Sequence, residues 1–231
     1  MLFDYSYKAL VFGASGAIGQ AFIQAFEQDP MCTHVESISR STHPLFDLER
    51  EDLLSQLVQS CMPAAPFNII VDATGALTLN GVGPEKSLSA LKQDLMGKAF
   101  QINAIGPVML LRHFAPLLAS GPSIYAKLSA RVGSISDNKK GGWYGYRASK
   151  AALNMFLQTA AIELQRKNPA LRVLALQPGT VRSGLSKPFA GSVEHLLEPQ
   201  ESVAGMLTAM KKAPPKQGAL FIDYNCQEIG W

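Results

Sequence analysis

The fold is decided near the amino terminus, where an apolar run passes directly into a turn rich in glycine. The run is Lys8 to Phe12, and the turn reads Gly13-Ala14-Ser15-Gly16-Ala17-Ile18-Gly19. Glycines at this spacing between a strand and a helix let the backbone approach a pyrophosphate, and the helix N-terminus then offers free N–H groups. The turn therefore predicts a dinucleotide site, although such a turn can also serve only to close a tight bend.

Downstream, short apolar runs alternate with helical patterns. The further predicted strands are 35–39, 45–46, 67–71, 123–128, 171–176 and 219–222. The predicted helices are 17–28, 48–60, 88–118 with a break near Gly97 and boundaries or kinks at Pro107 and Pro116, 146–166 and 200–212. This alternation favours an α/β fold: a Rossmann-type, doubly wound, mostly parallel seven-stranded sheet with helices on both faces. Residues 1–231 are expected to form a single domain.

The composition argues against several other classes of protein. The net charge is only +3, from 21 basic and 18 acidic residues without a dense basic run, so neither a nucleic acid nor a membrane partner is indicated. Cys32, Cys61 and Cys226 are far apart and lack metal-ligand spacing, so we expect neither a disulfide framework nor a metal site. The first residues contain no basic segment followed by an apolar one, which favours a cytoplasmic protein.

Ser39 and Arg40 end the second predicted strand, about 20 residues past the glycine turn. An acidic residue at this place would bind the ribose 2′-hydroxyl of NAD, whereas the Arg40 guanidinium can pair with a 2′-phosphate. NADP(H) is therefore predicted in preference to NAD(H), and a plain surface arginine is the alternative. Asp47 and Leu48 are expected to border the adenine, but Asp47 fits the N-cap of the next helix equally well.

Tyr146 and Lys150 are four residues apart in a predicted helix, so their side chains share one face. A nearby cation lowers the pKa of a phenol by roughly 1 to 3 units from about 10, which makes the phenol usable in proton transfer. A Tyr-x-x-x-Lys pair also arises by chance. Its position after the fifth predicted strand strengthens it, because sites in open parallel sheets lie beyond the carboxyl ends of the strands.

Several further motifs follow in a fixed order. After the glycine turn come Asp72-Ala73-Thr74-Gly75, Phe100-Gln101-Ile102-Asn103, Tyr146 with Lys150, and Pro178-Gly179-Thr180-Val181-Arg182-Ser183. In this combination the chain resembles the short-chain dehydrogenase/reductase family over nearly its whole length. The runs 129–134 and 141–150 are similar to the C-factor-like and carbonyl-reductase-like branch of that family.

The resemblance implies roles for the matching residues. Tyr146 would protonate a substrate carbonyl, Lys150 would bind the nicotinamide ribose and lower the pKa of the phenol, and Asn103 would hold a water in a proton relay. A helix-breaking Asn103 bonded to backbone is the alternative. The residues implied in cofactor binding are Gly13, Ser15, Gly16, Ala17, Ile18, Gly19, Ala73, Thr74, Gly75, Asn103, Tyr146, Lys150, Pro178, Gly179, Val181 and Ser183.

Three positions depart from the family pattern. Ala17 stands where a glycine is frequent, Asp72 where an asparagine is common, and Ala130 where the substrate-binding serine is expected. A hydroxyl from Ser129 or from Ser134 could replace that serine; Ser129 is preferred, with Ser134 as its rival. If neither reaches the substrate, turnover should be slow, because a lost oxyanion donor costs about 10² to 10³ in rate.

The expected reaction is the NADP(H)-dependent reduction of a carbonyl compound to an alcohol. A lid is expected over residues 183–197, in which Leu185, Phe189, Val193 and Leu196 favour a hydrophobic carbonyl substrate or else pack as a small helix. A homodimer or homotetramer is expected through the helices that carry Asn103 and Tyr146. The alternative function is a nucleotide-binding cell-signalling or regulatory protein of the C-factor type with little catalysis, which Ala130 motivates.

Overall fold

The computed structural model describes residues 2–186 and 196–231, and within this part of the chain it contains one sheet of six parallel strands. The strands are β1 (Tyr7–Phe12), β2 (Cys32–Ile38), β3 (Ile69–Asp72), β4 (Ser123–Leu128), β5 (Leu171–Gln177) and β6 (Ala219–Asp223). Their order in the sheet is β2-β1-β3-β4-β5-β6. The chain first extends the sheet on one side of β1 and then on the other, so a topological switch point lies between β1 and β3.

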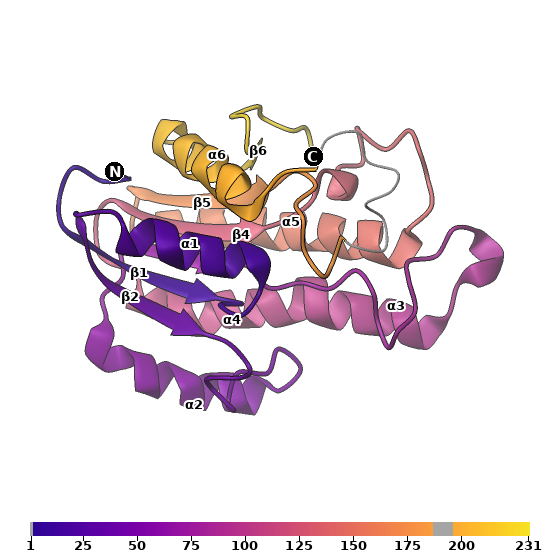
Figure 1. Ribbon diagram of the computed structural model, residues 1–231, viewed down its shortest axis with the longest axis horizontal. Coiled ribbons are helices and arrows are strands. Elements are labelled where there is room, and N and C mark those ends of the chain that lie inside the picture. The colour runs from indigo at the N-terminus through magenta and orange to yellow at the C-terminus, as the bar shows by residue number, and fades with distance from the viewer. Residues whose placement is uncertain (1, 187–195) are drawn as a thin grey trace.

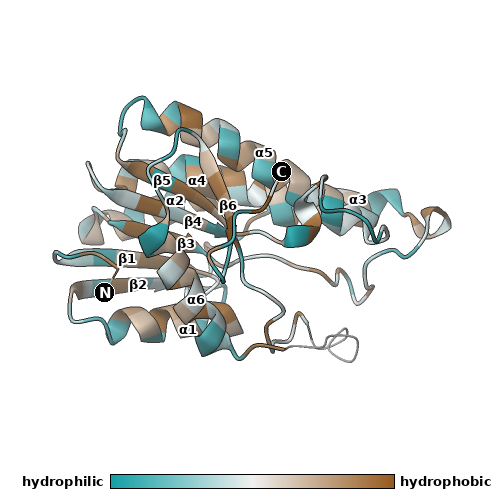
Figure 2. Ribbon diagram, turned by 90° about the horizontal axis from the view of Figure 1, so that it is seen from above, coloured by the Kyte–Doolittle hydropathy of each residue, from teal (hydrophilic) through white to brown (hydrophobic). Residues whose placement is uncertain are grey.

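Helices cover both faces of this sheet (Figure 1). One face carries α1 (Ala17–Glu27) and α6 (Pro199–Lys212), and the other carries α2 (Glu51–Cys61), α4 (Gly106–Phe114) and α5 (Tyr144–Gln165). Figure 2 shows the sheet between these two layers. Alternate residues of β1 explain the arrangement, because Leu10 and Phe12 enter the core under α2, α4 and α5, while Ala9 and Val11 enter the core under α1 and α6. The predicted doubly wound α/β class is confirmed.

The prediction of seven strands is wrong for the described residues. Residues 45–46, predicted as a strand, lie in a turn in which the N–H of Phe46 bonds to the carbonyl of His43 (2.9 Å) and that of Asp47 to Leu45 (3.1 Å). These local bonds satisfy the backbone without a partner strand. The apolar character has another cause: Phe46 is buried and stacks on Phe12, with ring centroids 5.6 Å apart.

The predicted break at Gly97 is also wrong. Gly97 lies inside α3 (Gln93–Phe100), and nothing stands within 4 Å of the place its Cβ would take. One glycine costs a helix only about 1 kcal/mol, so the helix continues. The irregularity comes later, at a π-helical segment, Gln101–Ile105, which joins α3 to α4 and contains Asn103. A π-turn inside a helix frequently marks a functional position.

The remaining helical pieces are single 3₁₀ turns: Met62–Ala64, Leu88–Ala90, Ala115–Leu117 and Arg131–Gly133. Pro116 lies in the third of these, just after α4, and Pro107 lies in the first turn of α4, where proline is tolerated. Within the described segments, no helix combines the length and apolar character that crossing a bilayer requires.

Candidate active site

A cavity of about 580 Å³ opens at the carboxyl ends of the strands. Residues at or just after the ends of four strands line it: 15–19 after β1, 73–75 and 77 after β3, 128–132 at the end of β4, and 177–181 and 183–186 at the end of β5. Trp143, Tyr146 and Lys150 line it from the start of α5. Parallel strands end at one edge of a sheet, so residues far apart in sequence converge there.

The glycine turn forms one end of the cavity. Gly13 has a φ of 77°, and a Cβ on Gly19 would stand 2.2 Å from the carbonyl oxygen of Gly13. These positions therefore require glycine if the turn is to close this tightly against α1. No side chain caps α1, and its first turn carries no acidic residue, so its first N–H groups are available to an anionic ligand. The extra methyl of Ala17 belongs to the first residue of this helix and does not prevent the turn.

The predicted adenosine-side residues lie outside this cavity lining. Ser39 is buried, and its hydroxyl bonds to those of Ser41 (2.8 Å) and Thr42 (2.9 Å). Arg40 follows β2 and is exposed to solvent. Since β2 adjoins β1 in the sheet, Arg40 stands on the side of the glycine turn away from Tyr146.

Asp47 does not cap the following helix. Its carboxylate accepts the N–H of Glu49 (2.9 Å), whereas α2 begins at Glu51 after Arg50. Leu48 is tied to the site through its carbonyl oxygen, which accepts a bond from the side chain of Gln101 (3.1 Å) in the π-helical segment.

Tyr146 and Lys150 share one face of α5, as their spacing predicts. The Lys150 Nζ lies 5.7 Å from the centroid of the Tyr146 ring and donates to the carbonyl oxygen of Leu128 (3.1 Å). Gly133 permits this packing, because a Cβ there would stand 2.8 Å from the Cβ of Lys150. The lysine is nearly fully buried, while the tyrosine keeps part of its surface exposed.

Burial dominates the protonation of both groups. It raises the pKa of Tyr146 to about 12 and lowers the pKa of Lys150 well below its ordinary range. A phenol becomes an anion when it loses its proton, and an ammonium is charged until it loses one, so an apolar setting disfavours both charged forms. In this arrangement burial sets the direction of the Tyr146 pKa, and the lowering of that pKa by Lys150 stays a prediction.

Asn103 braces the loop after β3. Its Oδ1 accepts the N–H of Ala76 (2.8 Å), and its Nδ2 donates to the carbonyl of the same residue (2.9 Å). Nδ2 also lies 3.4 Å from the hydroxyl of Ser149. The side chain thus makes the backbone hydrogen bonds that the alternative interpretation expected, and it holds Ala76, which lies between the lining residues Gly75 and Leu77. The water relay stays a prediction.

The two candidate serines differ in position. Ser129 lines the cavity together with Ala130, but its hydroxyl donates to Oδ1 of Asn154 (2.6 Å). Ser134 lies outside the lining, where its hydroxyl bonds to Ser136 (3.1 Å) and accepts the N–H of Asp137 (3.1 Å). Its position at the cavity therefore favours Ser129 as the substrate-binding hydroxyl. The proton of that hydroxyl, however, is already donated to Asn154.

Part of the predicted lid falls outside the described residues. The part that is not described is residues 187–195, which include Pro188, Phe189, Gly191 and Val193. Of the rest, Leu185 is exposed and lines the cavity, and the Ser183 hydroxyl bonds to Ser186. Pro178, Gly179 and Val181 also line the cavity, and Gly179, with a φ of 77°, leaves room for Leu197 and Tyr224.

Trp143 is a cavity residue that the sequence reasoning did not single out. It has a φ of 54° and follows Gly141 and Gly142, whose φ values are 62° and 66°. Its ring lies edge-on to that of Tyr146, with centroids 6.2 Å apart. The carboxylate of Glu85 accepts the N–H of Gly145 (3.1 Å) and so satisfies an N–H group at the start of α5. The paired glycines before Trp143 were the available signal.

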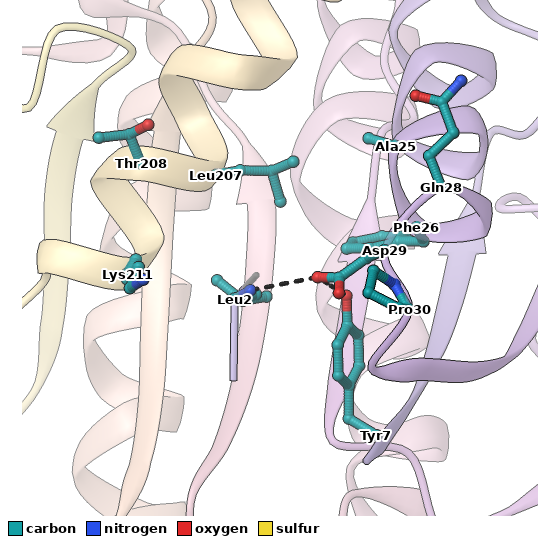
Figure 3. Close-up of a pocket in the computed structure, with 10 residues that line it drawn as sticks. All are labelled: Leu2, Tyr7, Ala25, Phe26, Gln28, Asp29, Pro30, Leu207, Thr208 and Lys211. Carbon is teal, nitrogen blue, oxygen red and sulfur yellow. Dashed lines mark hydrogen bonds between the residues drawn. The ribbon is translucent and has the colours of Figure 1, made fainter. Parts of the chain in front are cut away.

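A second pocket, of about 440 Å³, lies beside Tyr7 at the start of β1, between residues of α1 and α6 (Figure 3), and none of the residues above lines it. Its polar groups bond one another: Asp29 accepts the hydroxyl of Tyr7 (3.0 Å) and the N–H of Leu2 (3.3 Å). Across the described residues, no group of three or more His, Cys, Asp or Glu side chains is placed to hold a metal ion.

Comparison with known proteins adds independent findings. Residues 7–192 match the family model described as short chain dehydrogenase. The 1-hydroxy-2-glutathionyl-2-methyl-3-butene dehydrogenase of Rhodococcus sp. (strain AD45) is 32% identical over 165 residues, which cover 71% of this chain and 69% of that protein. C-signal of Myxococcus xanthus is 36% identical over 137 residues, 59% of this chain and 78% of that protein.

Two solved structures illustrate the likeness of fold. The carbonyl reductase Sniffer of D. melanogaster superposes with a TM-score of 0.83 at 20% identity. The match covers 98% of this chain and 100% of the Sniffer chain. The NADPH-bound carbonyl reductase from chicken fatty liver has a TM-score of 0.82 at 20% identity and covers 98% of this chain and 95% of its own. At this identity the likeness concerns the fold alone.

The protonation of Tyr146 can be measured directly. In an alkaline ultraviolet titration, Tyr146→Phe should remove one tyrosinate step, and the missing step should have a midpoint near pH 12, because burial raises the pKa of Tyr146 to about 12. Circular dichroism at each pH would verify that the protein is still folded, and Tyr144→Phe, in the same turn of α5, is the control. A missing step with its midpoint at or below the ordinary value of 10.0 would contradict the prediction.

Proposed function

Because the chain belongs to the short-chain dehydrogenase family, we propose that it is an NADP(H)-dependent oxidoreductase that reduces a carbonyl compound to an alcohol, with Tyr146 as proton donor. The observation that carries this proposal is a single cavity with two chemically different ends. The glycine turn and the N-terminus of α1 form one end, suited to phosphates, and Tyr146 with Lys150 forms the other. A dinucleotide that spans the cavity would bring its nicotinamide to the phenol.

The proposed chemistry divides between cofactor and protein. The bound cofactor supplies the hydride that adds to the carbonyl carbon. Tyr146 gives its proton to the carbonyl oxygen, and a phenol that stays protonated at neutral pH is suited to that direction. Lys150, whose ammonium donates to the carbonyl of Leu128, would bind the nicotinamide ribose. Asn103 holds Ala76, between the lining residues Gly75 and Leu77, and Ser129 is the proposed hydroxyl beside the substrate.

The same residues support a nicotinamide dinucleotide as the bound molecule. Gly13 to Gly19 leave the backbone open to the pyrophosphate, and Ala73 to Gly75 with Pro178, Gly179, Val181 and Ser183 would flank the nicotinamide half. Arg40 carries the preference for NADP(H), because it is exposed and an exposed guanidinium can make paired bonds to a 2′-phosphate. The hydroxyls of Ser39, Ser41 and Thr42 cluster at the same strand end.

The substrate is proposed to be a hydrophobic carbonyl compound. Trp143, Leu77, Val132 and Leu185 contribute apolar surface near Tyr146. A homodimer or homotetramer and a cytoplasmic location are part of the same proposal. The regulatory alternative keeps one observation in its favour: Ala130 has no hydroxyl, and the hydroxyl of the adjacent Ser129 is already bonded to Asn154.

Turnover tests the main proposal. Purified protein mixed with NADPH and a panel of aldehydes, ketones and quinones should consume the cofactor, as followed by its absorbance. Tyr146→Phe should lower kcat by about 10² or more, because positioned acid catalysis contributes roughly 10² to 10⁴. Tyr144→Phe should retain activity. Tight NADPH binding without turnover of any carbonyl compound would instead favour the regulatory alternative.

The cofactor preference depends on Arg40. Arg40→Ala should raise KM for NADPH about tenfold or more, since a charge-assisted hydrogen bond contributes roughly 1.5 to 3 kcal/mol. KM for NADH should change little, because that cofactor lacks the 2′-phosphate. Arg50→Ala, which removes another exposed arginine after β2, is the matched control. Equal losses with the two cofactors would refute the assignment.

Ala130→Ser tests the missing hydroxyl. The substitution should raise kcat by about tenfold or more, because an oxyanion donor is worth about 10² to 10³ in comparable sites. In the unsubstituted protein, Ser129→Ala should lower kcat if Ser129 acts in its place, while Ser134→Ala should have no effect. A kcat that neither Ala130→Ser nor Ser129→Ala changes would remove serine from the mechanism.

A further inference from the structure

β4 carries one charged side chain, Lys127, in the middle of the sheet. It is completely buried, and its Nζ donates to Oδ1 of Asp72 (3.0 Å), to the carbonyl oxygen of Thr74 (2.6 Å) and to the hydroxyl of Thr74 (3.1 Å). Asp72 ends the neighbouring strand β3, and its Cα pairs with that of Lys127 in the register. The two charges therefore face each other where both strands reach the cavity.

The pair is bonded almost entirely through one carboxylate oxygen. Oδ1 of Asp72 also accepts the N–H (2.9 Å) and the hydroxyl (2.6 Å) of Thr74, while Oδ2 has no hydrogen-bond partner among the described residues. Buried ion pairs are expensive to form and contribute little net stability compared with apolar residues. Stability alone is thus a weak reason to place a lysine and an aspartate here.

The pair is coupled to the active site through Thr74 and Gly75. Lys127 holds the carbonyl of Thr74, and both Thr74 and Gly75 line the cavity. Gly75 has a φ of 150°, and a Cβ on it would stand 3.5 Å from the Nζ of Lys150. Both ammonium groups therefore lie close to the segment formed by Thr74 and Gly75.

Charged and titratable groups meet here from three elements. Lys127 and Tyr125 come from β4, Asp72 from β3, and Lys150 with Tyr146 from α5, while the π-helical segment contributes the neutral Asn103. Lys127 lowers the pKa of Lys150 in addition to burial, and Asp72 opposes that change. Burial also lowers the pKa of Lys127, and Asp72 opposes that change. Burial and Asp72 both raise the pKa of Tyr125.

We propose that Asp72 and Lys127 are positioning residues for the reaction: the pair fixes the cavity wall at Thr74 and Gly75 and sets the electrostatic field in which Lys150 carries its proton. The two charges act on Lys150 in opposite senses, so their balance determines the pH at which Lys150 loses its charge. The catalytic consequence rests on the proposed function, because it requires that Lys150 bind the cofactor. The effect on Lys150 itself does not.

Lys150 can be titrated without substrate or cofactor. Competitive labelling with trace acetic anhydride over a pH series, read by mass spectrometry of the peptide that contains Lys150, reports its midpoint. Lys127→Met should raise that midpoint by about 1 unit, as expected when a close like charge is removed. Asp72→Asn should leave it unchanged or lower it. Asp72→Asn with Lys127→Met should give a midpoint between those of Lys127→Met and the unsubstituted protein, because Lys127 affects Lys150 more than Asp72 does.

Thermal unfolding separates this effect from loss of structure. Both single variants should be less stable, since each leaves one buried charge unpaired, but only removal of Lys127 should raise the midpoint. If Lys127→Met does not fold, the double variant, which leaves no unpaired charge, still tests the prediction. Lys8→Met is the control, because Lys8 is at the start of β1 and bonds to the carbonyl of Ala64 (2.9 Å). In Lys8→Met the titration midpoint of Lys150 should be the same as in the unsubstituted protein.

An unchanged or lowered Lys150 midpoint in Lys127→Met and in the double variant would overturn the inference. The pH profile of kcat gives a second readout, in which the alkaline limb should move to higher pH in Lys127→Met. If the Lys150 midpoints differ between the variants as expected and no carbonyl compound is reduced, the electrostatic inference stands and the proposed function fails. If turnover is found and the Lys150 midpoints of all variants coincide, the proposed function stands and the electrostatic inference fails.

Discussion

The parallel direction of the strands is the constraint on which the rest of the structure depends. Because β1, β3, β4 and β5 all end at one edge of the sheet, the segments that follow them meet in one cavity. The chain adds β2 on one side of β1 and β3 on the other, and this switch in strand order separates the loops at that edge and opens room for a ligand. The glycine turn, the wall at Thr74 and the helix that carries Tyr146 are thereby held around the same space without being close in sequence.

Burial then decides the chemistry of the groups in this cavity. Burial favours the neutral forms of both groups: it raises the pKa of Tyr146, which keeps part of its surface exposed, and it lowers the pKa of Lys150, which is nearly fully buried. Gly133 leaves room for Lys150 to pack closely, and Asn103 holds Ala76 through two backbone hydrogen bonds. The pair Asp72 and Lys127 adds two charges behind the cavity wall, so the electrostatics of the site extend one layer below the residues that line it.

Many features could be predicted from residue patterns alone. Alternating apolar runs and helical patterns identified every strand that is found in the described residues, and the order of the motifs identified the family and the similarity to C-signal. The errors came from short or ambiguous signals. Residues 45–46 are apolar because Phe46 packs on Phe12, and a strand and a buried turn look alike over two residues. Gly97 resembled a helix end, but one glycine on an open helix face does not end a helix.

What the sequence by itself determined is what depends on local spacing: the glycine turn before α1, the shared face of Tyr146 and Lys150, and the absence of serine at position 130. What only the tertiary structure decided is what depends on contacts between distant segments. Ser129 is bonded to Asn154, Asn103 to Ala76, and Lys127 to Asp72, each across at least 25 residues of chain. The hydrophobic periodicity of the sequence cannot predict such pairs, because the sheet register and helix packing that bring them together arise from burial of the whole core.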